Sequence, residues 1–376
     1  MSRTLLFLFF LTAIQVTYGQ TTIHGSFEHG GIIRTFSYYV PATYVPGQPA
    51  PMLIGLHGLG SSGEDFAQYR DFRSIADSAG LILVHPDGSS ILGIKFWNYG
   101  NIPGSEVDDV GFIEILIDHI SAQYSINQNR IYCVGMSNGG FMAYALACRS
   151  SRFAAIGSVT GSMGVDTYNS CLPDRPLPVI HIHGTEDSVN PYSGTSTSKS
   201  IDDVIKLWVN KNGCNIMATN GIPNIDQNDG ATAEKQLYSG GINGNKVALV
   251  KVKGGGHSWP GSPTPGSNEI ICMDFDARME IWNFFRQFEL NGSSRTSKPL
   301  AEIINIFPNP SHGLININSG DLSIKSIQIL DINGNLLKNQ KRSLDNTINA
   351  RELKAGVYIL KIYGKDFLYS TKIILL

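Results

Sequence analysis

The sequence predicts an α/β domain, a mostly parallel sheet flanked by helices, followed by a small all-β sandwich domain. From about residue 23 to 290, short β-rich segments alternate with helical patterns, which is typical of a parallel sheet covered by helices. Residues 302–376 instead alternate apolar and polar residues in short segments. Between the two, residues 291–301 begin with a Gly, Ser, Thr and Lys segment that indicates a linker.

The composition supports folded domains and argues against a nucleic-acid partner. Of the 376 residues, 42% are hydrophobic and 16% are charged, so the chain can bury a sizeable core. The formal net charge is -2, and no dense Lys/Arg run offers a binding surface for phosphates.

The N-terminus indicates a secreted protein. Arg3 precedes an apolar run over residues 5–14, and small and polar residues follow around Gly19. This run is shorter than the roughly 20 residues that cross a bilayer, so we predict a cleaved signal peptide over residues 1–19, with a membrane anchor as the alternative. The α/β domain then covers residues 20–290, and no stable membrane span is expected.

The first domain has the following predicted elements. Residues 23–40 form two antiparallel strands that turn at Gly30 and Gly31, and further strands cover 52–57, 81–85, 130–135, 154–159, 179–183 and 247–252. A helix begins at Asp108 and Asp109 and carries Val110, Ile113, Leu116, Ile117 and Ile120 on one face. Helical patterns also cover residues 141–147 and 274–288, the latter with Met279, Ile281, Trp282 and Phe285 inward.

Export permits disulfide bonds among the five cysteines, and an odd number leaves at least one unpaired. Cys133 lies in an apolar strand and is the expected free thiol. The other four allow three pairings, of which we expect Cys148 with Cys171 and Cys214 with Cys272. No CxxC occurs, so structural zinc is not expected.

The segment GMSNGG at residues 135–140 carries the clearest chemical signal. A Gly-x-Ser-x-Gly between a strand and a helix forms a tight turn that exposes the serine, so Ser137 is the predicted nucleophile. Oxyanion donors are expected after an earlier strand, in GLHGLG at residues 55–60. The backbone N–H groups of Leu59 and Asn138 are the candidates, and His57 is expected to hold the loop.

A general base and its orienting acid follow the nucleophile in the chain order Ser, Asp, His. His257 lies in the glycine-rich segment GGGHSWP at residues 254–260 and is the predicted base. Asp187 ends the segment HGTED at residues 183–187 and is the predicted acid, with Glu186 as its rival.

Other residues admit two interpretations. His181 and His183 share one face of a strand, so they could form a metal pair, but packing beside Asp187 is favoured. Trp97 and Trp259 lie in loops and either contact substrate or pack ordinarily. Asp108 and Asp109 serve as helix-start residues or support the site. No metal site and no cofactor is expected.

Five motifs in order, at residues 56–58, 107–112, 135–140, 183–187 and 255–261, resemble secreted α/β-hydrolase esterases. That group includes polyhydroxybutyrate depolymerases and the feruloyl and acetylxylan esterases of carbohydrate esterase family 1. The resemblance implies the α/β-hydrolase fold, with Ser137 as nucleophile, Asp187 as acid and His257 as base. Many polyester depolymerases of this group have a cysteine where this chain has Leu59.

The last domain resembles the type IX secretion sorting domain, through FPNP at residues 307–310, Gly313, DING at 331–334 and LKAGVY at 353–358. This resemblance implies the type IX secretion machinery as a partner and an extracellular or cell-surface location. A carbohydrate-binding β-sandwich is the alternative.

Together these observations predict a secreted serine esterase that hydrolyses carboxylic esters through an acyl-enzyme. The expected substrates are feruloyl or acetyl esters of plant cell-wall polysaccharide, with polyhydroxybutyrate, a polyester, as the alternative. A serine peptidase and a non-catalytic surface binder are further alternatives from the same residues.

Overall fold

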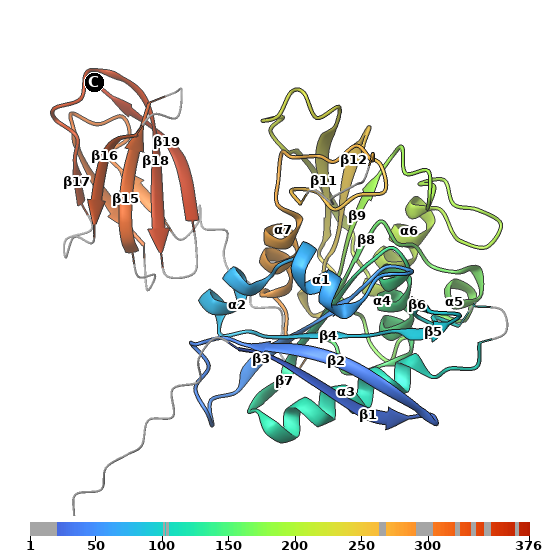
Figure 1. Ribbon diagram of the computed structural model, residues 1–376. Helices are drawn as coiled ribbons and strands as arrows, with labels where there is room; N and C mark the ends of the chain where they lie inside the picture. Colours follow the sequence, from blue (N-terminus) through green and yellow to red (C-terminus); the bar gives the residue numbers. More distant parts are fainter. Residues whose placement is uncertain are drawn as a thin grey trace, which may run out of the picture. The chain divides into compact units, whose positions relative to one another are not determined.

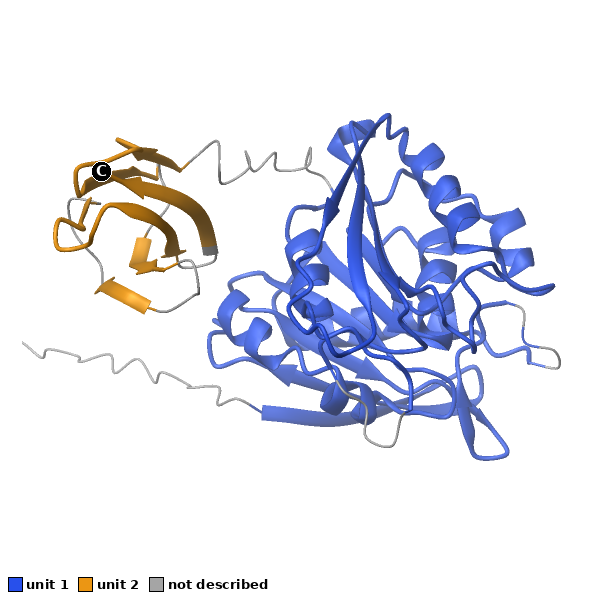
Figure 2. Ribbon diagram, turned by 90° about the horizontal axis from the view of Figure 1, so that it is seen from above, with its two compact units in different colours: residues 1–294 blue, residues 295–376 orange. Residues whose placement is uncertain are grey.

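The computed structural model describes residues 21–100, 102, 105–262, 268–290, 304–319, 324–331, 336–341, 347–364 and 368–376. The chain divides into two compact units, Met1–Ser294 and Arg295–Leu376 (Figure 2). The predicted signal peptide and the predicted linker lie outside the described residues.

A ten-stranded sheet forms the centre of the first unit, in the order β1-β2-β4-β3-β7-β8-β9-β12-β11-β10 (Figure 1). The strands are β1 (Thr21–His29), β2 (Ile32–Val40), β3 (Ala50–Leu56), β4 (Ile82–Pro86), β7 (Ile126–Met136), β8 (Ala155–Val159), β9 (Val179–Gly184), β10 (Ile216–Gly221), β11 (Thr232–Ser239) and β12 (Val247–Lys253). The six central strands are parallel, whereas β1, β2, β10 and β11 pair antiparallel with their neighbours. The predicted mostly parallel sheet is confirmed.

Helices cover both faces of this sheet because its strands send alternate apolar side chains to opposite sides. The helices are α1 (Gly63–Tyr69), α2 (Arg73–Ala79), α3 (Asp109–Gln123), α4 (Asn138–Arg149), α5 (Val165–Ser170), α6 (Ile201–Asn212) and α7 (Ala277–Phe285), with a short 3-10 turn, η1 (Ile242–Gly244). One core contains side chains from α3, α4 and α6, and the other contains side chains from α1, α2 and α7. On β3, Ile54 faces the first core and Leu53 the second.

Some predicted elements differ from the structure. The last helix, α7, covers only nine residues, and its Met279 is exposed, although Ile281, Trp282 and Phe285 are buried as predicted. The outer strand β10 was not predicted. All of its residues are exposed, so it lacks the buried alternate positions that mark a strand in sequence. A hairpin of β5 (Ser89–Ile91) and β6 (Ile94–Phe96) was also missed.

The cysteines test the predicted disulfide bonds. Cys148 and Cys171 are bonded, and Cys133 is a buried free thiol, as predicted. The predicted bond between Cys214 and Cys272 is wrong, because both are free thiols. Cys214 packs against the core on the α6 face of the sheet and Cys272 belongs to the core on the α7 face, so the sheet separates them.

The second unit consists of two small antiparallel sheets, β13-β14-β17 and β16-β15-β18-β19. Their strands are β13 (Asn305–Phe307), β14 (Leu314–Asn318), β15 (Ile324–Leu330), β16 (Leu336–Lys341), β17 (Thr347–Asn349), β18 (Gly356–Gly364) and β19 (Leu368–Leu375). Ile315 and Ile348 of one sheet share a core with Ile329 and Leu360 of the other. The predicted all-β sandwich is confirmed.

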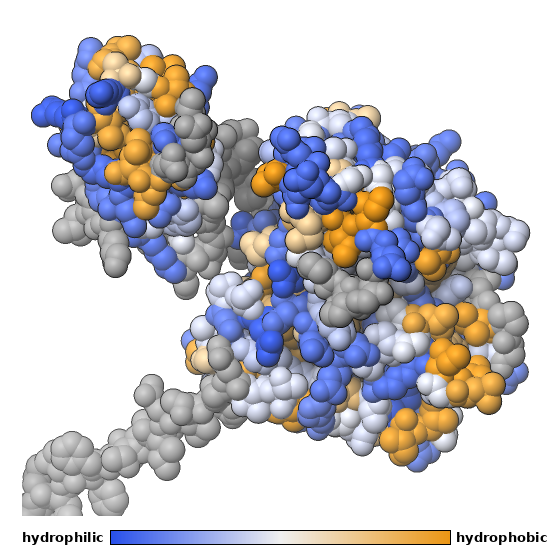
Figure 3. All heavy atoms as spheres, turned by 45° about the horizontal axis from the view of Figure 1, so that its top comes forward, coloured by the Kyte–Doolittle hydropathy of each residue, from blue (hydrophilic) through white to orange (hydrophobic). Residues whose placement is uncertain are grey.

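The surface of the first unit is mostly hydrophilic on the face drawn in Figure 3, with separate apolar patches. The most exposed large apolar side chain among the described residues is Leu92, in the turn between β5 and β6. Within the described part of the chain, no helix has the length and apolar character needed to cross a membrane.

Candidate active site

The predicted site residues follow the carboxyl ends of neighbouring parallel strands. Leu59 follows β3, Ser137 follows β7, Asp187 follows β9 and His257 follows β12. Because parallel strands end at one edge of the sheet, these segments gather there, which is the usual binding edge of such folds.

Ser137 sits in a strained turn between β7 and α4. Its backbone has φ 55° and ψ -122°, a conformation that is uncommon for a residue with a side chain. The turn depends on close packing: a Cβ on Gly135 would lie 2.0 Å from the carbonyl oxygen of Gly139, and one on Gly139 would lie 2.2 Å from that of Leu56. The Ser137 N–H donates to the Val159 carbonyl at 2.9 Å, which fixes the turn to β8.

Asp187 and His257 are brought together by the loops after β9 and β12. The Nδ1 atom of His257 lies 2.8 Å from Oδ2 of Asp187. A carboxylate can only accept, so Nδ1 carries the proton and Nε2 is left with its lone pair. Asp187 is buried, and its Oδ1 also accepts from the backbone N–H groups of Val189 and Asn190 at 3.0 and 2.7 Å.

Glu186, the rival acid, is exposed, and its backbone N–H, not its carboxylate, donates to the Gly255 carbonyl at 3.0 Å. The geometry therefore favours Asp187 as the partner of His257. Among the described residues, no hydrogen bond joins the Ser137 hydroxyl to His257. Such contacts are often long before substrate binds.

His57 holds the loop that carries Leu59. Its Nε2 accepts from the Gly88 N–H at 2.9 Å, so its Nδ1 carries the proton that is donated to the Gly58 carbonyl at 2.7 Å. Burial lowers the pKa of His57, which keeps the imidazole neutral. This matches the structural role predicted for His57. A Cβ on Gly58 would lie 3.5 Å from the Ser137 Cβ, so the loop passes directly beside the nucleophile.

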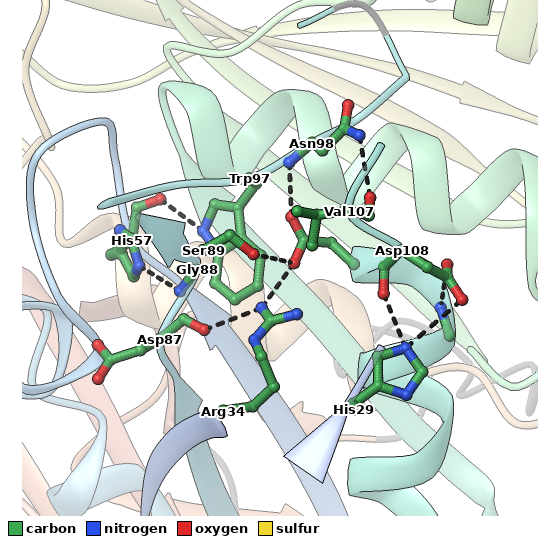
Figure 4. Close-up of polar contacts among 12 residues, drawn as sticks. His29, Arg34, His57, Asp87, Gly88, Ser89, Trp97, Asn98, Val107 and Asp108 are labelled. Carbon is green, nitrogen blue, oxygen red and sulfur yellow. Dashed lines mark hydrogen bonds and ion pairs between the residues drawn. The ribbon is translucent and has the colours of Figure 1, made fainter. Parts of the chain in front are cut away.

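Trp97 connects the two candidate oxyanion segments. Its indole Nε1 donates to the His57 carbonyl at 3.0 Å (Figure 4). Its backbone N–H donates to Oδ1 of Asn138 at 2.6 Å, and its carbonyl accepts from Nδ2 of Asn138 at 3.1 Å. These three hydrogen bonds, which we call the Trp97 clamp, tie the residues next to Leu59 to the residue after Ser137.

A buried ion pair anchors the Trp97 clamp (Figure 4). Nη2 of Arg34 lies 2.6 Å from Oδ1 of Asp109, and both side chains are almost completely buried. Oδ2 of Asp109 accepts from the Asn98 N–H at 2.6 Å, which fixes the residue after Trp97. The Arg34 guanidinium also lies 3.8 Å from the centre of the Phe112 ring. Burial raises the pKa of Asp109, an effect that the positive charge of Arg34 opposes.

The two adjacent acids at the start of α3 therefore have different functions. Asp108 caps the helix by accepting from the Gly111 N–H at 2.8 Å. The Asp109 carboxylate does not cap the helix; it pairs with Arg34 and holds the backbone at Asn98. The sequence offered one signal for this difference: a single N-cap position cannot use two carboxylates.

Of the two interpretations of Trp97 and Trp259, the structure favours packing over contact with substrate, because both side chains are fully buried. Trp97 forms the clamp described above. Trp259, two residues after His257, packs edge-on against Phe66 and Phe72. The local sequence around Trp97 and Trp259 did not predict their burial, because the residues that they contact come from distant parts of the sequence.

His181 and His183 form a hydrogen-bonded chain behind Asp187. The Asn190 carbonyl accepts from His183 Nε2 at 2.8 Å, so His183 Nδ1 accepts from His181 Nε2 at 3.1 Å, and His181 Nδ1 accepts from the Tyr144 hydroxyl at 2.8 Å. Every ring nitrogen is thereby engaged, which leaves no lone pair for a metal. Burial lowers the pKa of both histidines. The packing interpretation is favoured over the metal pair.

Among the described residues, Asp229, Cys272 and Asp274 also bring potential metal-ligand atoms together, within 4.8 Å of one another. Backbone N–H groups already occupy its carboxylates. Oδ1 of Asp274 accepts from Ile225 and Asp226, and the two oxygens of Asp229 accept from Ala231 and Met273. Burial raises the pKa of Cys272 to about 12, so this thiol is not readily ionised. The two carboxylates therefore stabilise the loops whose backbone N–H groups they accept from.

Comparison with known proteins relates both units to families. A model of the secretion system C-terminal sorting domain matches residues 305–376, and a model of the prolyl oligopeptidase family matches residues 74–258. The chain is 27% identical over 276 residues to a bifunctional acetylxylan esterase/xylanase of Neocallimastix patriciarum, covering 72% of this chain and 36% of that protein. It is 27% identical over 271 residues to feruloyl esterase D of Neurospora crassa, and the match covers 69% of this chain and 83% of that protein.

Among solved structures, an acetyl xylan esterase from Aspergillus awamori is similar, with 14% identity and a TM-score of 0.48, covering 67% of this chain and 94% of that chain.

Substitution of Arg34 by Met should destabilise the protein strongly, because it leaves the Asp109 carboxylate buried without its counter-charge. Loss of one partner from a buried pair costs about 3 to 5 kcal/mol. The matched control is Arg73→Met, which breaks a pair with Asp71 in which the arginine side chain is 54% exposed, and should cost less than about 1 kcal/mol. Urea unfolding measures both. Equal losses would contradict the assigned role of the Arg34 and Asp109 pair.

Proposed function

We propose that this chain, an α/β-hydrolase related to the feruloyl and acetylxylan esterases and carrying a C-terminal secretion sorting domain, is a secreted serine esterase. The observation that carries this proposal is the hydrogen-bonded pair of His257 Nδ1 and Asp187 Oδ2, 2.8 Å apart, which follows strands that end at the same sheet edge as the strained Ser137. The sorting domain supports secretion or display at the cell surface through the type IX machinery.

The proposed reaction uses an acyl-enzyme. Ser137 Oγ attacks the ester carbonyl while His257 Nε2 takes its proton, and Asp187 stabilises the imidazolium that forms. The carbonyl oxygen, now negative, accepts from the backbone N–H groups of Leu59 and Asn138. His257 then protonates the departing alcohol. Water, deprotonated by His257, attacks the acyl-enzyme in the same way and releases the acid.

The backbone N–H groups of Leu59 and Asn138 are both available to donate to the oxyanion. Asn138 is the first residue of α4, where backbone N–H groups have no partner within the helix. Among the described residues, no hydrogen bond engages the Leu59 N–H, although the next residue, Gly60, donates to the Lys95 carbonyl at 2.8 Å. Donors that are already oriented need no rearrangement as the oxyanion forms, which is the main source of their catalytic effect.

We propose feruloyl or acetyl esters of plant cell-wall polysaccharide as the substrates. The names of the relatives support this class, which is the reason to prefer it over a polyester. A second reason is that the oxyanion loop carries Leu59 where many polyester depolymerases of this group have a cysteine.

Substitution of Ser137 by Ala should abolish turnover of methyl ferulate and acetylated xylan, because the hydroxyl is the proposed nucleophile. Release of ferulate and acetate by the wild-type protein would be compared with the variant, and circular dichroism would confirm that the variant is folded. Full activity in the variant would contradict the proposal. Faster hydrolysis of a peptide or of polyhydroxybutyrate than of either ester would contradict the substrate class.

Substitution of Asp187 by Asn should lower kcat by about 10,000-fold, since the imidazole loses the partner that sets its tautomer. Glu186→Gln is the matched control, because it makes the same chemical change one residue earlier on an exposed side chain. It should leave kcat close to that of the wild type. A larger loss in the Glu186 variant would reverse the assignment of the acid.

Substitution of Trp97 by Phe should lower kcat by about 10- to 100-fold with little change in KM. It removes the hydrogen bond to the His57 carbonyl and so loosens the Leu59 donor, which acts mainly in the transition state. The control is Trp208→Phe, since the Trp208 indole N–H is buried without a partner among the described residues. If both variants lose activity equally, the effect is one of packing and the Trp97 clamp has no catalytic importance.

A further inference from the structure

A polar hollow of about 500 Å³ lies beside the oxyanion loop, on one face of β1, β2 and β4. Strand alternation and register place its residues in two rows. His24 of β1 pairs with Ser37 of β2, which pairs with His85 of β4. Ser26 of β1 pairs with Thr35 of β2, whose carbonyl accepts from the Asp87 N–H at 2.9 Å.

Two buried polar side chains in this hollow lack protein partners. Ser37 and His85 are each only 5% exposed, yet neither side chain has a hydrogen bond among the described residues. Neither Ser37 nor His85 is among the described residues with a buried polar atom that lacks a partner, so their polar atoms reach the open hollow, where they can bond to water or to a ligand. Thr35 and Asp87 in the other row already bond to each other at 2.6 Å.

The charges in the hollow favour a neutral ligand. Lys95 Nζ lies 2.9 Å from Asp87 Oδ1, so this pair cancels, and Glu64 adds a negative charge at the rim. Burial lowers the pKa of His85 to about 4, which leaves its imidazole uncharged near neutral pH. A serine hydroxyl and neutral imidazoles both complement hydroxyl groups, which can donate and accept. The size lies within the range of small-molecule sites.

The wall of the hollow is shared with the proposed active site. Oδ1 of Asp87 accepts from the Gly63 N–H at 2.9 Å, and the Lys95 carbonyl accepts from the Gly60 N–H at 2.8 Å. The N–H of Gly88, the residue after Asp87, donates to Nε2 of His57. Figure 4 shows the Asp87 carboxylate pointing away from Arg34 while its carbonyl faces the guanidinium. Two residues that line the hollow, Asp87 and Lys95, are therefore hydrogen-bonded to the segment that directly follows Leu59.

We propose that this hollow is a subsite for a neutral sugar unit of the polysaccharide that bears the ester, an inference that rests on the proposed esterase function. Ser37, His85 and His24 bind the sugar hydroxyls while the ester lies at Ser137. The subsite explains how a distant part of the polymer is recognised without contact with the acyl group.

The test compares two substrates with the same acyl group, methyl ferulate and a feruloylated xylo-oligosaccharide. Ser37→Ala and His24→Ala should each raise KM for the oligosaccharide ester by about 3- to 10-fold, the usual effect of one lost hydrogen bond, and leave methyl ferulate kinetics unchanged. Ser78→Ala, on α2 outside the hollow, is the matched control. Equal effects on both substrates, or no effect on either, would overturn the proposal.

A binding measurement separates this proposal from the proposed function. Xylotetraose is titrated by calorimetry into the full chain carrying Ser137→Ala, with tetragalacturonate as the anionic comparison. We expect xylotetraose to bind, to bind more weakly when Ser37→Ala is added, and to bind more tightly than tetragalacturonate. If the wild-type chain hydrolyses no ester while xylotetraose still binds, the esterase proposal fails and the subsite stands. Absent xylotetraose binding, or stronger binding of tetragalacturonate, would overturn the subsite.

Discussion

The proposed active site depends on the buried contact between Arg34 and Asp109. Through this pair, β2 holds the first residue of α3, and the same carboxylate fixes the backbone at Asn98. The adjacent Trp97 then holds both the oxyanion loop and the residue after the nucleophile. An ionic group is suited to this task because a carboxylate can accept several hydrogen bonds at fixed angles, whereas apolar packing sets positions less specifically.

The backbone strain at Ser137 is maintained by hydrogen bonds from neighbouring segments. Ser137 occupies an unfavourable backbone conformation, and such strain persists only when surrounding contacts determine it. Here the contacts come from Val159 beneath the serine and from the Trp97 clamp beside it. Asp187 is held in a comparable way by backbone N–H groups, and His183 lies behind it. The supported serine and the supported Asp187 thus lie at one sheet edge, with the substrate expected between them.

Sequence patterns located the residues with local signatures and missed those whose function depends on distant partners. The glycine spacing around Ser137 and the strand before Asp187 are local features, so both could be placed before the structure. The clamp function of Trp97 needs His57 and Asn138, which lie about 40 residues away on either side, and no pattern relates them. The wrong pairing of Cys214 with Cys272 has the same origin, because only the fold places them on opposite faces of the sheet.

The central claim is that Ser137 attacks an ester whose oxyanion is held by the Leu59 and Asn138 N–H groups. It is tested most directly by a crystal structure of the protein after reaction with a phosphonate ester. The account predicts phosphorus bonded to Ser137 Oγ, with the phosphoryl oxygen about 2.7 to 3.1 Å from both backbone nitrogens. Modification of another residue, or a phosphoryl oxygen that points away from these two donors, would contradict it.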